Sequence, residues 1–166
     1  MMMDSAAIAE HSPRLRRYAR ALAGDRHRAD DLVQDTLERA LVKFHLWRPG
    51  SDLRAWMFSI MHNVFINQLK SRRELALDEA TEAALEGAPQ SDPLQLRDLD
   101  AALRRLPAEQ REVLLLVGLE QLSYAEASQA LNVPVGTVMS RLSRGREHLR
   151  ELMFAAPAAT NLKIVK

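Results

Sequence analysis

Apolar residues recur every three or four positions along most of this chain, a spacing that predicts amphipathic helices. The first predicted helix begins at Ser12, which can act as its N-cap with Pro13 at the first helical position, and it stops at Gly24. Asp25 can cap the next helix, whose outer face is acidic. The apolar face of this second helix consists of Ala29, Leu32, Val33, Thr36, Leu37, Ala40, Leu41 and Phe44.

A turn and a third helix follow. The strongest turn signal in this half is Trp47-Arg48-Pro49-Gly50-Ser51-Asp52, because Pro-Gly breaks a helix and Ser51 or Asp52 can cap a new one. The turn therefore presents a tryptophan and an arginine. Apolar positions then keep helical spacing from Leu53 to about Arg73, where the helix ends in a run of basic residues.

Residues 74–94 differ in character from the helices on either side. They are rich in acidic residues, contain Gly87, Pro89 and Pro93, and have few large apolar side chains, which is typical of a linker. Twenty extended residues reach roughly 65 to 70 Å. The two helical parts of the chain therefore need not touch each other.

The second helical part contains the most informative segment. Leu94–Leu106 and Pro107–Gly118 read as helices, and Ser123-Tyr124-Ala125-Glu126 is a capping box that starts a short one. Asn132-Val133-Pro134 breaks this helix, and a longer, arginine-rich helix runs from about Val135 to Met153. Two helices joined by a short turn, the second one basic, match the helix-turn-helix plan.

The predicted fold is therefore all-α, with two small helical domains joined by a flexible acidic linker. The expected boundaries are 1–73 for the first domain, 74–94 for the linker, 95–153 for the second domain and 154–166 for a tail to which we assign no function. A chain of 166 residues with 47% hydrophobic residues can build cores of this size. It has no cysteine, so disulfides and thiolate metal sites are excluded.

The net charge of +1 hides a strong segregation of charge. Residues 1–73 carry 13 basic and 8 acidic side chains, residues 74–100 carry 1 and 8, and residues 101–166 carry 9 and 6. The corresponding net charges are +5, −7 and +3. Two basic blocks flank an acidic one, a distribution that is compatible with a nucleic-acid partner.

The arginine-rich helix is a candidate for reading duplex DNA, because a helix fits the major groove and arginine pairs bidentately with guanine. The alternative is a plain helical hairpin with a solvated arginine face. The basic end of the third helix could hold single-stranded DNA by stacking and phosphate contacts, together with Trp47, Arg48 and the polar side chains of Asn63, Asn67 and Gln68. Trp47 as an ordinary half-buried core residue is an alternative that the sequence leaves open.

The sequence gives little support to catalysis. Asp31 and Asp35 lie four residues apart on one helix face, but no histidine stands at a matching ligand spacing. No glycine-rich phosphate loop and no Ser-His-Asp arrangement stands out. We expect no enzymatic activity, no metal and no cofactor.

These motifs resemble those of bacterial RNA polymerase sigma factors of the extracytoplasmic-function (ECF) type, group 4 of the sigma-70 family. Residues 29–36 are similar to the family's region 2.2, and residues 53–60 with Asn63 are similar to regions 2.3 and 2.4. Residues 122–126 and 135–144 resemble region 4. Met139 and Ser143 depart from that pattern, since many members have arginine at the first position and several have a bulky residue at the second.

The resemblance implies a function in transcription initiation. Region 2 would bind core RNA polymerase at the beta-prime clamp helices and read the −10 promoter element, with one base flipped out near the turn. The implied polymerase contacts are Asp31, Gln34, Asp35 and Glu38. The implied −10 contacts are Trp47, Arg48, Asn63, Asn67, Lys70, Arg72 and Arg73.

Region 4 would read the −35 element with the second helix of its helix-turn-helix and meet the polymerase at the beta flap. The implied −35 contacts are Thr137, Ser140, Arg141, Arg144 and Arg146. The resemblance also implies control by an anti-sigma factor. The sequence shows no membrane span or signal peptide, so we expect a cytoplasmic protein that does not insert into membranes.

Three alternatives stay open at this point. The chain could be a sigma-like decoy that binds an anti-sigma protein and never touches DNA, although such a decoy predicts loss of the basic recognition surface. It could be a free-standing helix-turn-helix regulator, which would bind duplex DNA without polymerase. An enzyme that uses Asp31 or Asp35 is the remote third case.

Overall fold

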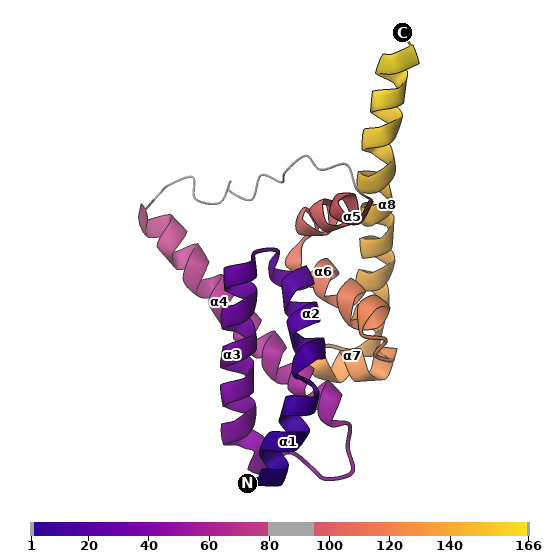
Figure 1. The fold of residues 1–166 in the computed structure, drawn as a ribbon. Coiled ribbons are helices and arrows are strands. Elements are labelled where there is room, and N and C mark those ends of the chain that lie inside the picture. Colours follow the sequence, from indigo (N-terminus) through magenta and orange to yellow (C-terminus); the bar gives the residue numbers. More distant parts are fainter. Residues whose placement is uncertain (1, 80–94, 166) are drawn as a thin grey trace.

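The computed structural model describes residues 2–79 and 95–165, with side chains placed for 5–77 and 98–154. Within these ranges the chain forms helices and turns and no strand, as predicted (Figure 1). The elements are α1 (Met2–Glu10), α2 (Ser12–Ala23), α3 (Arg26–Lys43), η1 (Phe44–Leu46), α4 (Leu53–Glu79), α5 (Gln95–Arg104), α6 (Ala108–Leu114), the π-helical turn η3 (Leu115–Leu119), α7 (Tyr124–Leu131) and α8 (Val135–Val165).

The predicted cap of α2 is wrong, whereas the next two caps are confirmed. α1 precedes α2 directly, so His11 has the helical angles φ −92° and ψ 0° and takes the N-cap position, and Ser12 lies inside the helix. An N-cap needs an extended backbone, which the preceding helix denies to this segment. Gly24 ends α2 in the left-handed region at φ 76°, and the Asp25 side chain accepts a hydrogen bond from the His27 amide.

Helices α1 to α4 pack around one set of apolar side chains. Tyr18 and Phe58 meet edge to face with ring centroids 4.9 Å apart. The predicted apolar face of α3 is confirmed at Ala29, Leu32, Val33, Thr36 and Ala40, all of which are buried. Leu41 departs from the prediction because 47% of it is exposed.

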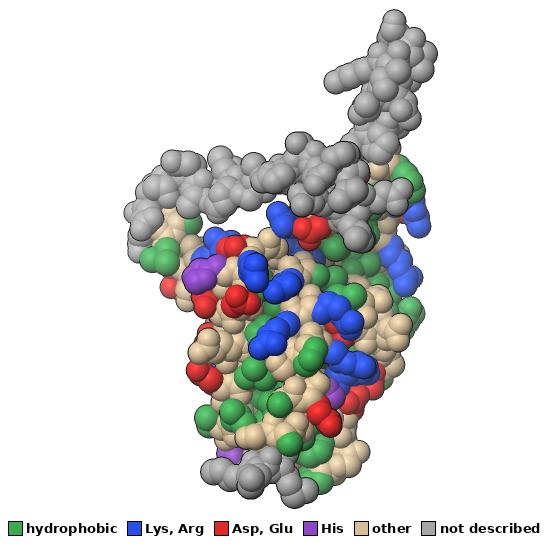
Figure 2. Space-filling view, viewed as in Figure 1, with side chains coloured by type: hydrophobic (Ala, Val, Ile, Leu, Met, Phe, Trp, Pro, Cys, Tyr) green, Lys and Arg blue, Asp and Glu red, His purple; other side chains and the backbone are tan. Residues whose placement is uncertain are grey.

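Helix α4 is longer than its sequence pattern predicts. It continues past Arg73 to Glu79, so the first six residues of the predicted linker are helical. Asp52 caps this helix by accepting a hydrogen bond of 3.0 Å from the Arg54 amide. Leu75 and Leu77 of this extension are 58% and 81% exposed, and Figure 2 shows hydrophobic side chains exposed near this end of α4. The extension therefore buries no apolar face, which is why periodicity did not find it. The rest of the predicted linker, 80–94, lies outside the described residues.

Helices α5 to α8 form the second helical part. The predicted capping box is confirmed: the Ser123 hydroxyl accepts from the Glu126 amide, and the Glu126 carboxylate accepts from the Ser123 amide. Asn132 then ends α7 in the left-handed region at φ 58°. The turn that follows directs α8 across α7 and α6 and completes the helix-turn-helix. The predicted end of this helix near Met153 is wrong, since α8 continues to Val165.

The two parts pack against each other, which the sequence left undetermined. Helix α4 lies on α7, and α2 lies on α5, α6 and η3, so the buried residues of both parts form one core (Figure 1). Arg111 ties the parts together by donating to the backbone carbonyl of Leu22 at 2.8 Å. His62 Nδ1 lies 2.6 Å from the buried carboxylate of Glu112. We call this the closed arrangement.

Candidate nucleic-acid interface

The acidic face of α3 is built as predicted, with one difference. Asp31, Gln34 and Glu38 are exposed. Asp35 is half-buried because Gln68 Nε2 of α4 donates a hydrogen bond of 3.2 Å to its Oδ2. Three of the four predicted polymerase contacts are therefore open to a partner, and Asp35 is held in place by α4.

The sequence pattern missed an apolar continuation of this face. Leu41 lies seven residues after Gln34 and three after Glu38, so the three side chains share one stripe of the helix. Leu41 is 47% exposed and Val42, beside it, is 73% exposed. Periodicity assigned Leu41 to the core. Its position seven residues after the polar Gln34 is the signal that could have placed it on the outer face instead.

The sequence left two roles open for Trp47, as a DNA-stacking residue or as a half-buried core residue. Its ring packs on Phe44 with centroids 5.3 Å apart, and the residue is half-buried. Its indole Nε1 is buried and has no hydrogen-bond partner among the described residues. Arg48, next to it, is exposed, and Gly50 provides the φ of 95° that the turn requires. The turn thus holds one edge of the indole against Phe44.

The polar residues of α4 divide by exposure. Asn63, Asn67 and Lys70 are exposed and follow one another at i, i+4 and i+7, so they form one stripe. Arg73 is exposed, whereas Arg72 is half-buried. Burial lowers the pKa of the Arg72 guanidinium, and the nearby Arg28 lowers it further.

Four of the five residues predicted to read the −35 element line one hollow of about 270 Å³ between α8 and α6. Its lining is Glu109, Gln110, Thr137, Ser140, Arg141 and Arg144. Arg141 is not free, since its Nη2 lies 3.2 Å from Glu109 Oε1 of α6. Arg146 is exposed but does not line this hollow. Met139, which departs from the family pattern, is 51% exposed on the same helix.

Arg146 is separated from the other four by helix geometry. Two residues advance a helix by about 200°, so Arg144 and Arg146 point to nearly opposite sides. Gly145 between them faces α6, where an added Cβ would lie 3.1 Å from Leu114 Cδ1. The resemblance to region 4 implied all five residues, and the structure brings four of them together.

Over residues 2–79 and 95–165, no three His, Cys, Asp or Glu side chains form a group that could hold a metal ion. Over the same part of the chain, no helix is both long and apolar enough to cross a membrane.

Two family models match the chain, one in each helical part. The Sigma2 domain of PhyR matches residues 8–62, and Sigma-70, region 4 matches residues 96–149. Among curated proteins, the ECF RNA polymerase sigma factor EcfG of Rhodopseudomonas palustris is 41% identical over 86% of this chain and 80% of its own length. SigM of Bacillus subtilis, another ECF sigma factor, is 31% identical over 82% of this chain and 86% of its own.

Solved structures agree with these matches. The sigma factor RpoE of Bartonella quintana, in complex with the anti-sigma factor NepR, is 36% identical and covers 89% of this chain and 94% of its own, with a TM-score of 0.77. CnrH, in complex with the cytosolic domain of CnrY, is 27% identical over 90% of this chain and 86% of its own, with a TM-score of 0.68. The anti-anti-sigma factor PhyR shares the fold at 21% identity over 87% of this chain and 48% of its own, with a TM-score of 0.61.

Proposed function

This chain belongs to the ECF family of RNA polymerase sigma factors, and from that premise we propose how its surfaces divide the work of transcription initiation. A sigma factor binds core RNA polymerase and directs it to promoters. The relatives are initiation factors rather than enzymes, and we propose no catalytic activity for this chain either. The observation that carries the proposal is its similarity to EcfG over a stretch longer than either helical part.

The part formed by α1 to α4 would bind the polymerase and the −10 element, and the part formed by α5 to α8 would bind the −35 element. Residues 1–73 and 95–153 are the domains we propose, joined by the acidic segment 74–94. Each carries its own family match, which supports this division. The segment between them contains acidic side chains that can mimic nucleic acid within the polymerase.

The outer face of α3 is the surface we assign to the beta-prime clamp helices. Asp31, Gln34 and Glu38 offer charge and hydrogen bonds, and the exposed Leu41 adds an apolar contact at one end. Asp35 accepts a hydrogen bond from Gln68, and this bond links the outer face of α3 to α4. Interfaces gain most of their affinity from a few desolvated apolar anchors within a polar rim, and Leu41 is suited to that role.

The −10 element would contact the turn after η1 and the stripe on α4. A flipped base needs stacking and hydrogen bonds to offset a few kcal/mol of unstacking. Trp47 supplies an aromatic face, and Arg48 and Asn63 supply donors. Phosphate contacts would come from Asn67, Lys70, Arg72 and Arg73 in the second half of α4.

The −35 element would lie against the face of α8 that borders the hollow between α8 and α6. Ser140 and Arg144 are free to contact base edges, and Thr137 lies near the N-terminus of α8, where backbone amides favour a phosphate. Arg141 must exchange its ion pair with Glu109 for a DNA contact. Met139 offers an apolar group to a thymine methyl in place of an arginine contact. Arg146 would touch the backbone or the beta flap from the other side.

We further propose control by an anti-sigma factor. Both RpoE and CnrH, which share this fold at 36% and 27% identity, were solved with such a partner. An anti-sigma factor that binds both helical parts would keep the polymerase and DNA surfaces covered. The place of action would be the cytoplasm, where core polymerase and promoter DNA are found.

The experiment that tests the proposed function is run-off transcription with purified core polymerase, genomic DNA and the full chain, followed by sequencing of the transcript 5′ ends. We expect transcripts that start a fixed distance downstream of a shared pair of sequence elements. Transcription that does not depend on the added chain, or tight binding to duplex DNA in the absence of polymerase, would contradict the proposal.

A second candidate function is favoured by one observation. The family model that matches residues 8–62 is the Sigma2 domain of PhyR, and the PhyR of Bartonella quintana is an anti-anti-sigma factor. A decoy of that kind binds an anti-sigma factor without reading DNA. The exposed Arg144, and the grouping of four predicted −35 contacts at one hollow, weigh against it, because a decoy has no use for a DNA-reading surface. The same run-off experiment separates the two, since a decoy yields no transcripts.

A further inference from the structure

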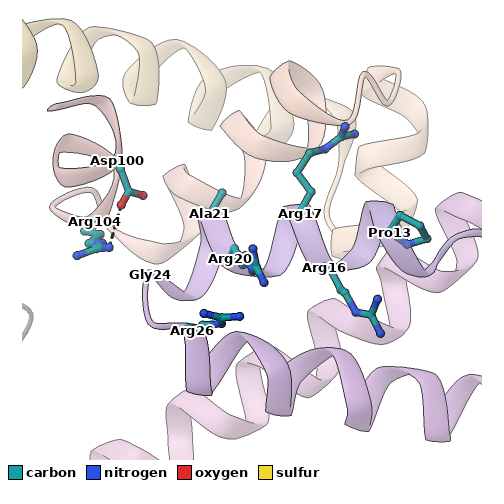
Figure 3. A pocket seen from close by; sticks show the side chains of 9 residues that line it. All are labelled: Pro13, Arg16, Arg17, Arg20, Ala21, Gly24, Arg26, Asp100 and Arg104. Atoms are coloured by element: carbon teal, nitrogen blue, oxygen red, sulfur yellow. Dashed lines mark hydrogen bonds and ion pairs between the residues drawn. The ribbon is translucent and has the colours of Figure 1, made fainter. Parts of the chain in front are cut away.

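A second hollow, of about 760 Å³, lies away from every surface discussed so far. It opens between α2, the start of α3 and α5, and Figure 3 shows it from close by. Its lining is Pro13, Arg16, Arg17, Arg20, Ala21, Gly24, Arg26, Asp100 and Arg104. Five arginines thus face a single carboxylate. We call this hollow the arginine groove.

Two of the five guanidiniums already have a partner. Arg17 Nη2 lies 3.2 Å from Glu120 Oε2, and Arg104 Nη2 lies 2.8 Å from Asp100 Oδ2. The other three, Arg16, Arg20 and Arg26, are exposed and form no ion pair with any residue that the structure describes. Figure 3 shows Arg20 and Arg26 close together, with Arg16 one turn along α2. Like charges gathered in this way repel, and an anion between them would remove the repulsion.

The arginine groove is completed by the packing of the two helical parts, because Asp100 and Arg104 of α5 form one of its walls. Arg104 comes from α5 and lies against the turn between α2 and α3. A Cβ at Gly24 would be 3.0 Å from Arg104 Nε, so this turn needs glycine both for its φ of 76° and for the arginine that packs on it. A ligand that fills the groove would therefore contact both parts and favour the closed arrangement.

The lining restricts the chemistry of the ligand. All the cations are arginines, whose planar forks hold phosphate oxygens in pairs. The lining offers no large apolar or aromatic side chain, since Pro13, Ala21 and Gly24 are its only uncharged residues. A peptide would find no pocket for an apolar anchor, and a nucleobase would find no ring to stack on. Such a site selects a small ligand with a high density of negative charge.

We propose that the arginine groove binds a small oligophosphate, a ligand with two or more linked phosphate groups, and that this ligand stabilises the closed arrangement. The volume lies within the range of about 300 to 1,000 Å³ that is typical of small-molecule sites. The shared chemistry is the phosphate chain, which an inorganic oligophosphate and a nucleotide both carry. The proposal does not depend on promoter recognition.

The test is isothermal titration calorimetry of the full chain with inorganic tripolyphosphate, and with ATP in a second arm. We expect tripolyphosphate to bind, and Arg20→Ala and Arg26→Ala each to weaken it about tenfold, a loss that one charge-assisted phosphate contact accounts for. Arg14→Ala is the matched control, because Arg14 is an exposed arginine of the same helix that does not line the groove. It should bind as the parent does.

The ATP arm distinguishes the sources of the phosphate chain. Equal affinities for ATP and tripolyphosphate assign binding to the phosphates alone, and tighter binding of ATP assigns the site to a nucleotide; both outcomes support the proposal. Circular dichroism establishes that each variant is folded, and Arg20→Gln and Arg26→Gln replace any that is not. The radius of gyration, measured by small-angle scattering, should not increase when tripolyphosphate binds, because the ligand favours the closed arrangement.

Three outcomes overturn the proposal. One is the absence of tripolyphosphate binding at low salt. Another is a loss of affinity in Arg14→Ala equal to that in Arg20→Ala, which would indicate a diffuse charge effect. The third is tighter binding of a poly-glutamate peptide or a single-stranded oligonucleotide with the same arginine dependence, which would assign the groove to an acidic protein or to nucleic acid.

Discussion

Single side chains on α8 and in the turn after η1 carry the most specific expectations. Arg144 and Ser140 of the hollow are exposed, whereas Arg141 is occupied by Glu109. Trp47 packs on Phe44 and is half-buried. Arg141 and Trp47 also contact other residues of the fold, so a substitution at either position changes packing as well as DNA binding.

Substitution Arg144→Ala should reduce run-off transcription from promoters with the −35 element by about tenfold, because a direct arginine contact to DNA is worth about 1 to 3 kcal/mol. The measurement is transcript yield at subsaturating protein concentration. Arg150→Ala is the control, since Arg150 is exposed on the same helix and pairs with Glu147. Equal yields from Arg144→Ala and the parent would remove Arg144 from the −35 contacts.

Substitution Trp47→Ala should slow promoter opening more than it weakens polymerase binding. The indole would stack on a flipped base, an interaction worth about 1 to 3 kcal/mol, and it lies outside the acidic face of α3. Permanganate reactivity of unpaired thymines reports opening, and fluorescence anisotropy with core polymerase reports binding. Trp47→Phe keeps an aromatic face and should restore part of the opening rate. Equal loss of both properties would contradict the assigned role.

The buried phenol of Tyr18 should make the folded protein less stable at alkaline pH. Burial raises the pKa of its phenol well above the ordinary value, and the carboxylates of Glu112 and Glu120 raise it further. The unfolded chain therefore releases this proton near pH 10 while the folded chain keeps it, so the free energy of unfolding falls as pH rises above about 10. The slope due to this group is about 1.4 kcal/mol per pH unit.

Urea denaturation at several pH values checks this prediction. Tyr18→Phe retains the ring against Phe58 and should show a shallower fall above pH 10. Tyr124→Phe is the control, because Tyr124 is 38% exposed and should leave the parent's pH profile unchanged. Identical profiles for Tyr18→Phe and the parent would show that the phenol does not set the limit.

At the scale of one helix, α3 combines two functions on opposite faces. Its buried face holds the first helical part together, and its outer face offers charge and the exposed Leu41. Because the faces are separate, outer-face substitutions should leave folding unchanged. This separation makes α3 suitable for a test of polymerase binding alone.

Double substitution Asp31→Asn with Leu41→Ala should weaken binding to core polymerase by at least about tenfold, since it removes one charge and one apolar contact from the proposed interface. Competition for core polymerase against a labelled parent chain measures the effect. Asp30→Asn is the matched control, because Asp30 is an exposed neighbouring carboxylate outside the assigned set. Equal competition by all three chains would exclude this face as the polymerase contact.

At the scale of the whole molecule, the closed arrangement determines which surfaces are available together. Arg54 contributes to it by donating to the Glu120 carbonyl at 3.3 Å and by lying 3.6 Å from Glu126 Oε1. Residues 80–94 can span at most about 50 Å when fully extended, so separation of the two parts is limited in range. The closed arrangement also completes the arginine groove, whose lining comes from both parts.

Substitution Arg17→Met should shift the protein away from the closed arrangement. The Glu120 side chain is 0% exposed, and Arg17 is the partner of its carboxylate. Without that guanidinium the buried charge costs about 1 to 2 kcal/mol, a figure reduced because Arg17 itself is half-exposed. Small-angle scattering should show a larger radius of gyration than in the control Arg14→Met. An unchanged radius would show that other contacts suffice for closure.

Local patterns in the sequence determined most elements of this protein. Apolar spacing gave the helices other than α1, although it ended α4 and α8 too early. Gly24, Asp25 and Asp52 gave helix ends, and Ser123 with Glu126 gave the start of the helix-turn-helix. Each of these depends on contacts within a few residues, which is why the sequence suffices for them. The motifs also sufficed for the family.

Tertiary structure decided what depends on residues distant in the sequence. Helix α1 displaced the cap from Ser12, Asp35 is held by Gln68 of another helix, and Arg141 is paired with Glu109. Leu41 looked like a core residue because periodicity does not say which apolar positions another helix covers. The packing of the two parts arises from long-range burial and a few ion pairs, and no local pattern encodes it. The arginine groove is completed by the same packing.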